Sequence, residues 1–217
     1  MAALVFDVLI VILAGFLDAI GFTYLSALYV SFMSGNSTGL GIAVANGHSG
    51  FAFSSAAVLG SFVFGAFAGS LLVATRKPAA TPVVLAVEAG LVAGAAALVG
   101  HAEQVPSLLP VCIAMGMQNA VPRQVDGVEG GRSYVTGALF GMAKALALSV
   151  ADRRHLAQAA VHGSTWLALV SGAVGGSLSL AAFGLPRCLS FAALALLAIS
   201  AAHLILRMSS SGPVRQP

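Results

Sequence analysis

The sequence predicts an all-α integral membrane protein with about six transmembrane helices, two short re-entrant or half helices, and an internal 3+3 inverted repeat. Three observations lead to this prediction. The 217-residue chain is 59% apolar and only 8% charged, whereas a soluble domain averages about 25% charged residues. Long stretches of the chain carry no charge. Motifs of the first half also recur, in the same order, in the second half.

Apolar content this high cannot be buried in one soluble core of this size, because small domains leave much of their surface in water. The composition therefore excludes a soluble enzyme, a disordered chain and a nucleic-acid-binding protein. The net charge of +3 is ordinary loop charge that orients a membrane protein. Cys112 and Cys188 lie in apolar stretches, where nothing indicates a disulfide or a metal site.

Charge-free stretches locate the spanning helices, because a helix needs about 20 apolar residues to cross a bilayer. The longest such stretch, residues 19–75, holds two spans and extra material. We expect six spans, at 6–28, 53–74, 82–100, 107–122, 160–182 and 188–206.

Two further apolar segments, 31–47 and 134–150, are too short or too interrupted to span. Each begins with a Ser-Gly or Thr-Gly element, and we expect each to be a re-entrant or half-length helix. Such elements occur at membrane depth only where protein buries them or a cavity adjoins them. We expect one membrane domain over 1–208 and a disordered polar tail over 209–217.

Lys and Arg residues orient the predicted helices. With six spans and both termini in the cytoplasm, nearly all basic residues fall on the cytoplasmic side, as the positive-inside rule requires. Arg187 is the exception. An eight-span alternative places more of these charges outside. The first helix lacks the basic start of a signal peptide and is expected to be retained.

The two halves, 6–100 and 107–206, share four ordered matches. Residues 15–19 (GFLDA) match 116–120 (GMQNA), and Ser34-Gly35 matches Thr136-Gly137. The other matches pair Gly65 and Gly69 with Gly172 and Gly176, and Pro82 with Pro186. Three spans per half reverse the direction of the second half, which predicts an inverted repeat. Many secondary transporters have this organisation, with sites in broken helices near the midplane.

Four motifs carry a resemblance to a known family: residues 15–19 (GFLDA), 32–39 (FMSGNSTG), 116–120 (GMQNA) and 134–137 (YVTG). With these motifs the chain resembles the bacterial YoaK-type multi-pass membrane proteins, a family defined as a domain of unknown function. Ser34 stands where this pattern has Thr. The resemblance covers essentially the whole chain. It implies about six spans and a bacterial inner-membrane location, but no activity.

Asp18 lies deep in the first predicted span. Intramembrane acids usually face a cavity or a partner and often act in proton relays. Its repeat counterpart is Asn119, which cannot titrate, and this pairing suits coupling to protons. The alternative is a structural hydrogen bond or ion pair between helices. Glu88, in the third span, has no charged counterpart and is a further candidate.

The segment that contains Ser34, Gly35, Asn36 and Thr38 is the most polar element at membrane depth. Gly permits a break, and Ser, Asn and Thr can cap the helix that follows. The free N–H groups of such a helix start can bind an anion. Tyr134, Thr136 and Gly137 would do the same from the opposite side. The alternative is a buried turn whose polar groups satisfy one another.

These observations predict a small-solute transporter or permease, coupled to protons through Asp18. Ten residues are candidates for its pathway: Asp18, Ser34, Gly35, Asn36, Thr38, Glu88, Asn119, Tyr134, Thr136 and Gly137. The second hypothesis is a non-transporting scaffold or accessory subunit. A third, an intramembrane hydrolase, uses the Gly-x-Ser-x-Gly pattern around Ser37, a motif that requires a strand-to-helix turn.

We expect no enzyme activity, cofactor, metal or nucleic acid, since neither a metal-ligand spacing nor a nucleotide-binding loop occurs in the sequence. The expected partners are the lipid bilayer and an unknown small solute. The chain is short for a transporter, so a homodimer is a candidate assembly.

Overall fold

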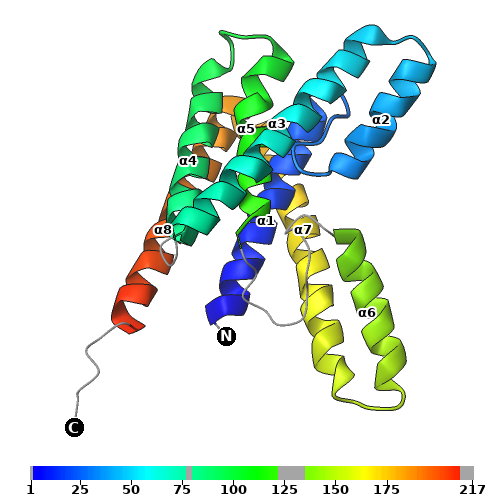
Figure 1. Ribbon diagram of the computed structural model, residues 1–217, viewed down its shortest axis with the longest axis vertical. Coiled ribbons are helices and arrows are strands. Elements are labelled where there is room, and N and C mark those ends of the chain that lie inside the picture. The colour runs from blue at the N-terminus through cyan, green and yellow to red at the C-terminus, as the bar shows by residue number, and fades with distance from the viewer. Residues whose placement is uncertain (1, 77–79, 122–134, 211–217) are drawn as a thin grey trace.

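The computed structural model describes residues 2–76, 80–121 and 135–210, with side chains described over 4–76, 80–121 and 135–206. These ranges form eight α-helices (Figure 1). The helices are α1 (Ala2–Tyr24), α2 (Met33–Ala45), α3 (Ser49–Thr75), α4 (Ala80–Leu98), α5 (Gln104–Asn119), α6 (Val135–Ser149), α7 (His155–Phe183) and α8 (Leu185–Ser210).

The helices confirm the predicted all-α membrane fold. Five of them, α1, α3, α4, α7 and α8, are long and apolar enough to cross a membrane. The sixth expected span corresponds to α5, which has only 16 residues and is about 24 Å long at 1.5 Å per residue. The two expected short segments are present as α2 and α6, of 13 and 15 residues. Helix α8 continues to Ser210, and residues 211–217 of the expected tail lie outside the described ranges.

Helix α1 ends at Tyr24, four residues before the expected end of the first span. Ser26 and Ala27 follow it with φ values of 53° and 80°. This left-handed region is uncommon for residues with a Cβ and cannot continue a right-handed helix. The chain then runs without helical structure to Phe32, and α2 begins at the next residue, Met33. We call residues 25–32 the break segment.

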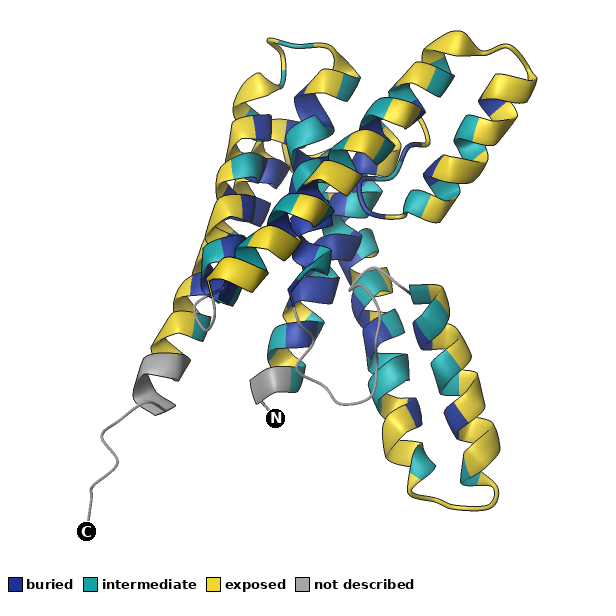
Figure 2. Cartoon of the chain, in the orientation of Figure 1, coloured by how far each residue is buried: buried dark blue, intermediate teal, exposed yellow. Residues whose placement is uncertain are grey.

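The long outer helices carry many exposed residues, whereas much of α5 is buried (Figure 2). Nine of the 16 residues of α5 are buried. By contrast, Phe64 and Phe67 of α3 and Leu178 of α7 are 60% or more exposed. Apolar surface on this scale is not found on soluble monomers, and a surrounding bilayer accounts for it.

Two helix crossings, α1 with α7 and α3 with α5, hold the centre of the molecule together. Both are made at glycines so close to the opposite backbone that a Cβ would overlap a carbonyl oxygen. In the first crossing Gly15 meets Leu169 and Gly172 meets Ile12. In the second, Gly116 meets Phe62 and Gly65 meets Ile113.

The two crossings use equivalent residues of the two halves. Adding 101 to the α1 positions gives the α5 positions, since 12 and 15 become 113 and 116. Adding 107 to the α3 positions gives the α7 positions, since 62 and 65 become 169 and 172. Two of the four sequence matches between the halves are therefore also matches of three-dimensional contacts.

The remaining helices extend this arrangement. Helix α2 packs on α3, α6 packs on α7, and α4 packs along α8, where the Ser200 hydroxyl donates a hydrogen bond of 2.8 Å to the Pro82 carbonyl. The α2–α3 hairpin extends to one end of the molecule, and the α6–α7 hairpin extends toward the opposite end, the direction in which α8 also runs (Figure 1).

Candidate functional site

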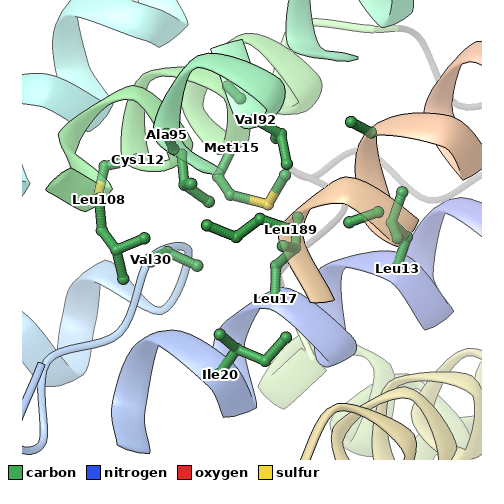
Figure 3. Packing of buried hydrophobic residues seen from close by; sticks show 14 of the residues in the cluster. Leu13, Leu17, Ile20, Val30, Val92, Ala95, Leu108, Cys112, Met115 and Leu189 are labelled. Carbon is green, nitrogen blue, oxygen red and sulfur yellow. The ribbon is translucent and has the colours of Figure 1, made fainter. Parts of the chain in front are cut away.

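Part of the break segment is buried inside the protein, where its backbone cannot rely on water. Leu25, Leu28 and Val30 are at most 4% exposed and belong to the main hydrophobic core. In Figure 3, Val30 lies beside Leu108 and Cys112 of α5. Since non-helical backbone at membrane depth must find partners within the protein, the hydrogen bonds of this segment define its role.

Asp18, near the end of α1, supplies part of these bonds. Its Oδ1 accepts the N–H groups of Val30 at 3.0 Å and Ser31 at 2.7 Å. Its Oδ2 accepts the hydroxyl of Ser31. Hydrogen bonds to a carboxylate are about twice as strong as neutral ones. The acid predicted from its depth in the membrane therefore holds the break segment in place.

Asn36, in α2, holds the same segment from the other side. Its Oδ1 accepts the N–H of Tyr29 at 2.9 Å, and its Nδ2 donates to the carbonyl of Tyr29 at 2.8 Å. The side chain is 1% exposed. Together, Asp18 and Asn36 bind the N–H groups of three successive residues, 29–31.

The expectation that Ser, Asn and Thr cap α2 is wrong. The helix already begins at Met33, and its N-cap, Phe32, makes no side-chain cap hydrogen bond. Ser34, Ser37 and Thr38 therefore lie within the helix, on its exposed face. The Ser37 hydroxyl donates to the Met33 carbonyl and the Thr38 hydroxyl to the Ser34 carbonyl. Only Asn36 reaches back beyond the helix start.

The same placement bears on the Gly-x-Ser-x-Gly pattern. Ser37 lies within α2, whereas the hydrolase motif places its serine on a strand-to-helix turn. Gly35 instead provides room for aromatic rings, since a Cβ there would come within 2.7 Å of the Phe32 ring. The Tyr29 ring contacts the Phe22 ring in a tilted pair and the Phe32 ring edge to face, with centroids 4.7 and 5.2 Å apart.

Glu88 lies at a different place, in the interface between α4 and α5. It is fully buried, and its Oε2 accepts a long hydrogen bond of 3.4 Å from Nε2 of Gln118. Gln118 is 2% exposed. Two polar side chains of this size are rarely buried unless they are paired, and this pair lies between the two halves.

The candidate residues of the second half are not brought together at one place. Asn119 ends α5, and its Nδ2 donates to the Met115 carbonyl of the same helix. Thr136 and Gly137 lie in the first turn of α6. Tyr134 lies outside the described residues. Of the ten predicted residues, the structure thus gathers Asp18, Gly35 and Asn36 at the break segment.

Three functional candidates were missed from the sequence. Ser31 could not be found, because its role depends on the fold of the break segment. Gln118 could have been found, because it is an amide inside a predicted span whose repeat counterpart, Leu17, is apolar. Asp7 is 4% exposed, where the Phe6 ring contacts the His203 ring of α8. Asp7 lies 11 residues, or about three helical turns, before Asp18. This spacing puts both acids on one face of α1 and was the signal that could have identified Asp7.

Comparisons with known proteins now place the chain in a family. The model of a family described as a protein of unknown function (DUF1275) matches residues 7–202. The chain belongs to this family. It is 33% identical over 169 residues to the UPF0700 transmembrane protein RA0705 of Rhizobium meliloti (strain 1021), a match that covers 76% of this chain and 71% of the relative. No solved structure matches.

These findings confirm the resemblance to a multi-pass membrane family of unknown function. The relative is named as a transmembrane protein, in agreement with the five apolar helices of spanning length. This DUF1275 chain is therefore a membrane protein, and its activity has to be inferred from its own structure.

Proposed function

We propose that this protein is a small-solute permease of the bacterial inner membrane, built from two inverted halves. The observation that carries the proposal is the equivalence of the two glycine crossings. The hairpins of the two halves also extend to opposite ends of the molecule (Figure 1). Inverted halves that cross at the centre are the architecture of many secondary transporters, which alternate between two related states.

The distribution of basic residues supports an orientation with both termini in the cytoplasm. Arg76 follows α3, and Arg153 and Arg154 precede α7. The α6–α7 connection lies at the end of the molecule toward which α8 runs (Figure 1). The opposite end has the short α2–α3 and α4–α5 connections, whose residues include His48, His101 and Glu103 but neither Lys nor Arg. This asymmetry follows the positive-inside rule.

The polar break segment supports a transport pathway between the halves. Broken helices with satisfied polar groups are where transporters place their substrate and coupling-ion sites. Asp18 is an intramembrane acid at this break, and such acids commonly carry protons. The proposed solute path passes this segment, and Asp18 couples it to protons.

The inverted arrangement is tested by labelling from the two sides of the membrane. Cys112 and Cys188 are replaced by alanine, and single cysteines are placed at His48 and Asp152, in the two hairpin connections. A membrane-impermeant thiol reagent is then applied to intact cells and to inverted vesicles. Labelling from opposite sides is expected. Labelling of both positions from one side would overturn the inverted repeat.

Transport is tested with the purified protein in liposomes under an inward proton gradient. Uptake of radiolabelled amino acids, organic acids and sugars is compared with that of empty liposomes. For a solute that is taken up, Asp18→Asn should abolish the pH dependence, because asparagine keeps the shape but cannot titrate. Unchanged pH dependence in that variant would remove Asp18 from the coupling mechanism.

One observation favours a second candidate, a non-transporting scaffold or accessory subunit. Asp18, Ser31, Asn36 and the backbone of Tyr29 satisfy one another, as a purely structural break would require. In that case Asn36→Ala and Thr136→Ala change stability, while every solute in the panel gives the uptake of empty liposomes.

We propose no enzymatic activity for this chain. Labelling of Ser37 by a fluorophosphonate probe would contradict this part of the proposal. A second copy of the chain is a candidate partner in the bilayer, and single-molecule photobleaching of the labelled protein in vesicles would count the copies.

A further inference from the structure

The break segment is attached to the protein in an uneven way. Its side-chain hydrogen bonds, among the described residues, all come from Asp18 of α1 and Asn36 of α2. On the side that faces α5, the segment has apolar packing: Val30 belongs to the same hydrophobic core as Leu108 and Cys112 (Figure 3). The polar attachment of this segment therefore depends on two side chains, and one of the two is an acid.

The start of the segment is held in an unfavourable backbone conformation. Ser26 and Ala27 are both in the left-handed region, which residues with a Cβ adopt rarely and which is retained only where the surroundings impose it. Just beyond them, the segment is fixed by Asp18 at Val30 and Ser31. The strain at Ser26 and Ala27 therefore favours displacement of the segment when its hydrogen bonds to Asp18 weaken.

We propose that the break segment is a gate that Asp18 holds closed while it is ionised and releases when it takes up a proton. The proton adds to Oδ2, and the new O–H group donates to the Ser31 oxygen. The Ser31 hydroxyl then loses its acceptor, and the bonds from the Val30 and Ser31 N–H groups become neutral instead of charge-assisted. In the proposed permease this segment would be a regulated gate, and that role rests on the proposed function.

Within the described parts of the chain, the elements packed around this part of α1 bring no charged side chain against Asp18. From α7 the close contacts are made by Gly172, Gly176 and the backbone of Leu169. From α8, Leu189 and the thiol of Cys188 belong to the same core. From α5, the buried thiol of Cys112 belongs to this core as well. Asp18 is thus the group whose ionisation changes the attachment of the gate.

The gate is tested through the accessibility of Val30, which is fully buried. In a background with Cys112 and Cys188 replaced by alanine, Val30→Cys is reacted with a water-soluble maleimide in liposomes. The rate is divided by that of Ser26→Cys, an exposed position of the same segment, which corrects for the effect of pH on thiol reactivity. The expected ratio rises about tenfold or more from neutral to acidic pH, in line with the loss of charge-assisted bonds.

Asp18→Asn provides the matched variant, because it is permanently neutral and nearly identical in shape. Its ratio should be high at every pH, with helix content and thermal midpoint showing that the protein is folded. Ser31→Ala, which keeps the acid and removes one donor, should raise the neutral-pH ratio by a smaller factor. A ratio that is the same in wild-type and Asp18→Asn protein, and independent of pH in both, would overturn the gate.

The labelling requires no solute, so the gate and the permease can fail separately. A pH-dependent ratio without uptake of any solute supports the gate and counts against transport. Uptake with a constant ratio supports transport and overturns the gate.

Discussion

The first half of this membrane protein fixes its break with an acid and an amide, whereas the second half has different residues at the matching positions. Asp18 corresponds to Asn119, and Asn36 corresponds to Ala138, which is buried in α6. The glycines at the helix crossings, in contrast, are the same in both halves. The packing of the helices is thus repeated, while the polar groups that act on the break are not.

This difference separates a shared feature, the glycines at the helix crossings, from a feature that differs between the halves, the polar side chains at the break segment. Each crossing requires glycine, because a Cβ would overlap the facing backbone, so both copies of the motif must have glycine there. Polar side chains carry no such constraint once the helices are packed.

The largest expected effect comes from the shared crossings. Gly65→Ala and Gly172→Ala each place a Cβ on a carbonyl oxygen of the facing helix, so the helices must separate. Each should lower the free energy of unfolding by about 1–3 kcal/mol or more, and by similar amounts, because the two contacts are equivalent. The thermal midpoint in detergent measures the change.

Gly90→Ala is the matched control, since nothing lies within 4 Å of a Cβ at that position of α4. It should leave stability unchanged or raise it, because alanine favours the helix by up to about 1 kcal/mol. If Gly65→Ala were costly and Gly172→Ala harmless, the two crossings would not be equivalent and the comparison of the halves would lose its basis.

A smaller effect is expected from the amide that only the first half has. Asn36→Ala leaves the N–H and carbonyl of Tyr29 without their partner, in a buried site. This should cost about 1–3 kcal/mol of stability. Ser37→Ala, on the exposed face of the same helix, removes one bond within α2 and should change stability by less than about 0.5 kcal/mol. Equal midpoints for both variants would mean that the break segment does not depend on Asn36.

Most of this arrangement could be predicted from the sequence, because it follows from hydrophobicity and repetition. Charge-free stretches located the helices to within a few residues, and the offsets of 101 and 107 paired the glycines that make the two equivalent crossings. The end of α1 was misplaced, since the left-handed residues Ser26 and Ala27 have no distinctive sequence signal. The partners of Asp18 are backbone groups, which any residue supplies, so no pattern of side chains could reveal them.

The smallest expected effect concerns Glu88 and Gln118, whose repeat counterparts, Ala192 and Leu17, are apolar and 1% exposed. Gln118→Leu removes the donor to Glu88, Glu88→Ala removes the acceptor, and the double variant installs the apolar pair of the other half. The double variant should cost less than the sum of the single ones, by about 0.5–1.5 kcal/mol.

The low end of this range is expected, because the bond measures 3.4 Å and weakens with length. Thermal unfolding of the four proteins in detergent gives the coupling free energy directly. Strict additivity would mean that the two side chains are buried side by side without supporting each other. The functional difference between the halves would then rest on Asp18 and Asn36, and the pathway would have to be sought at the break segment alone.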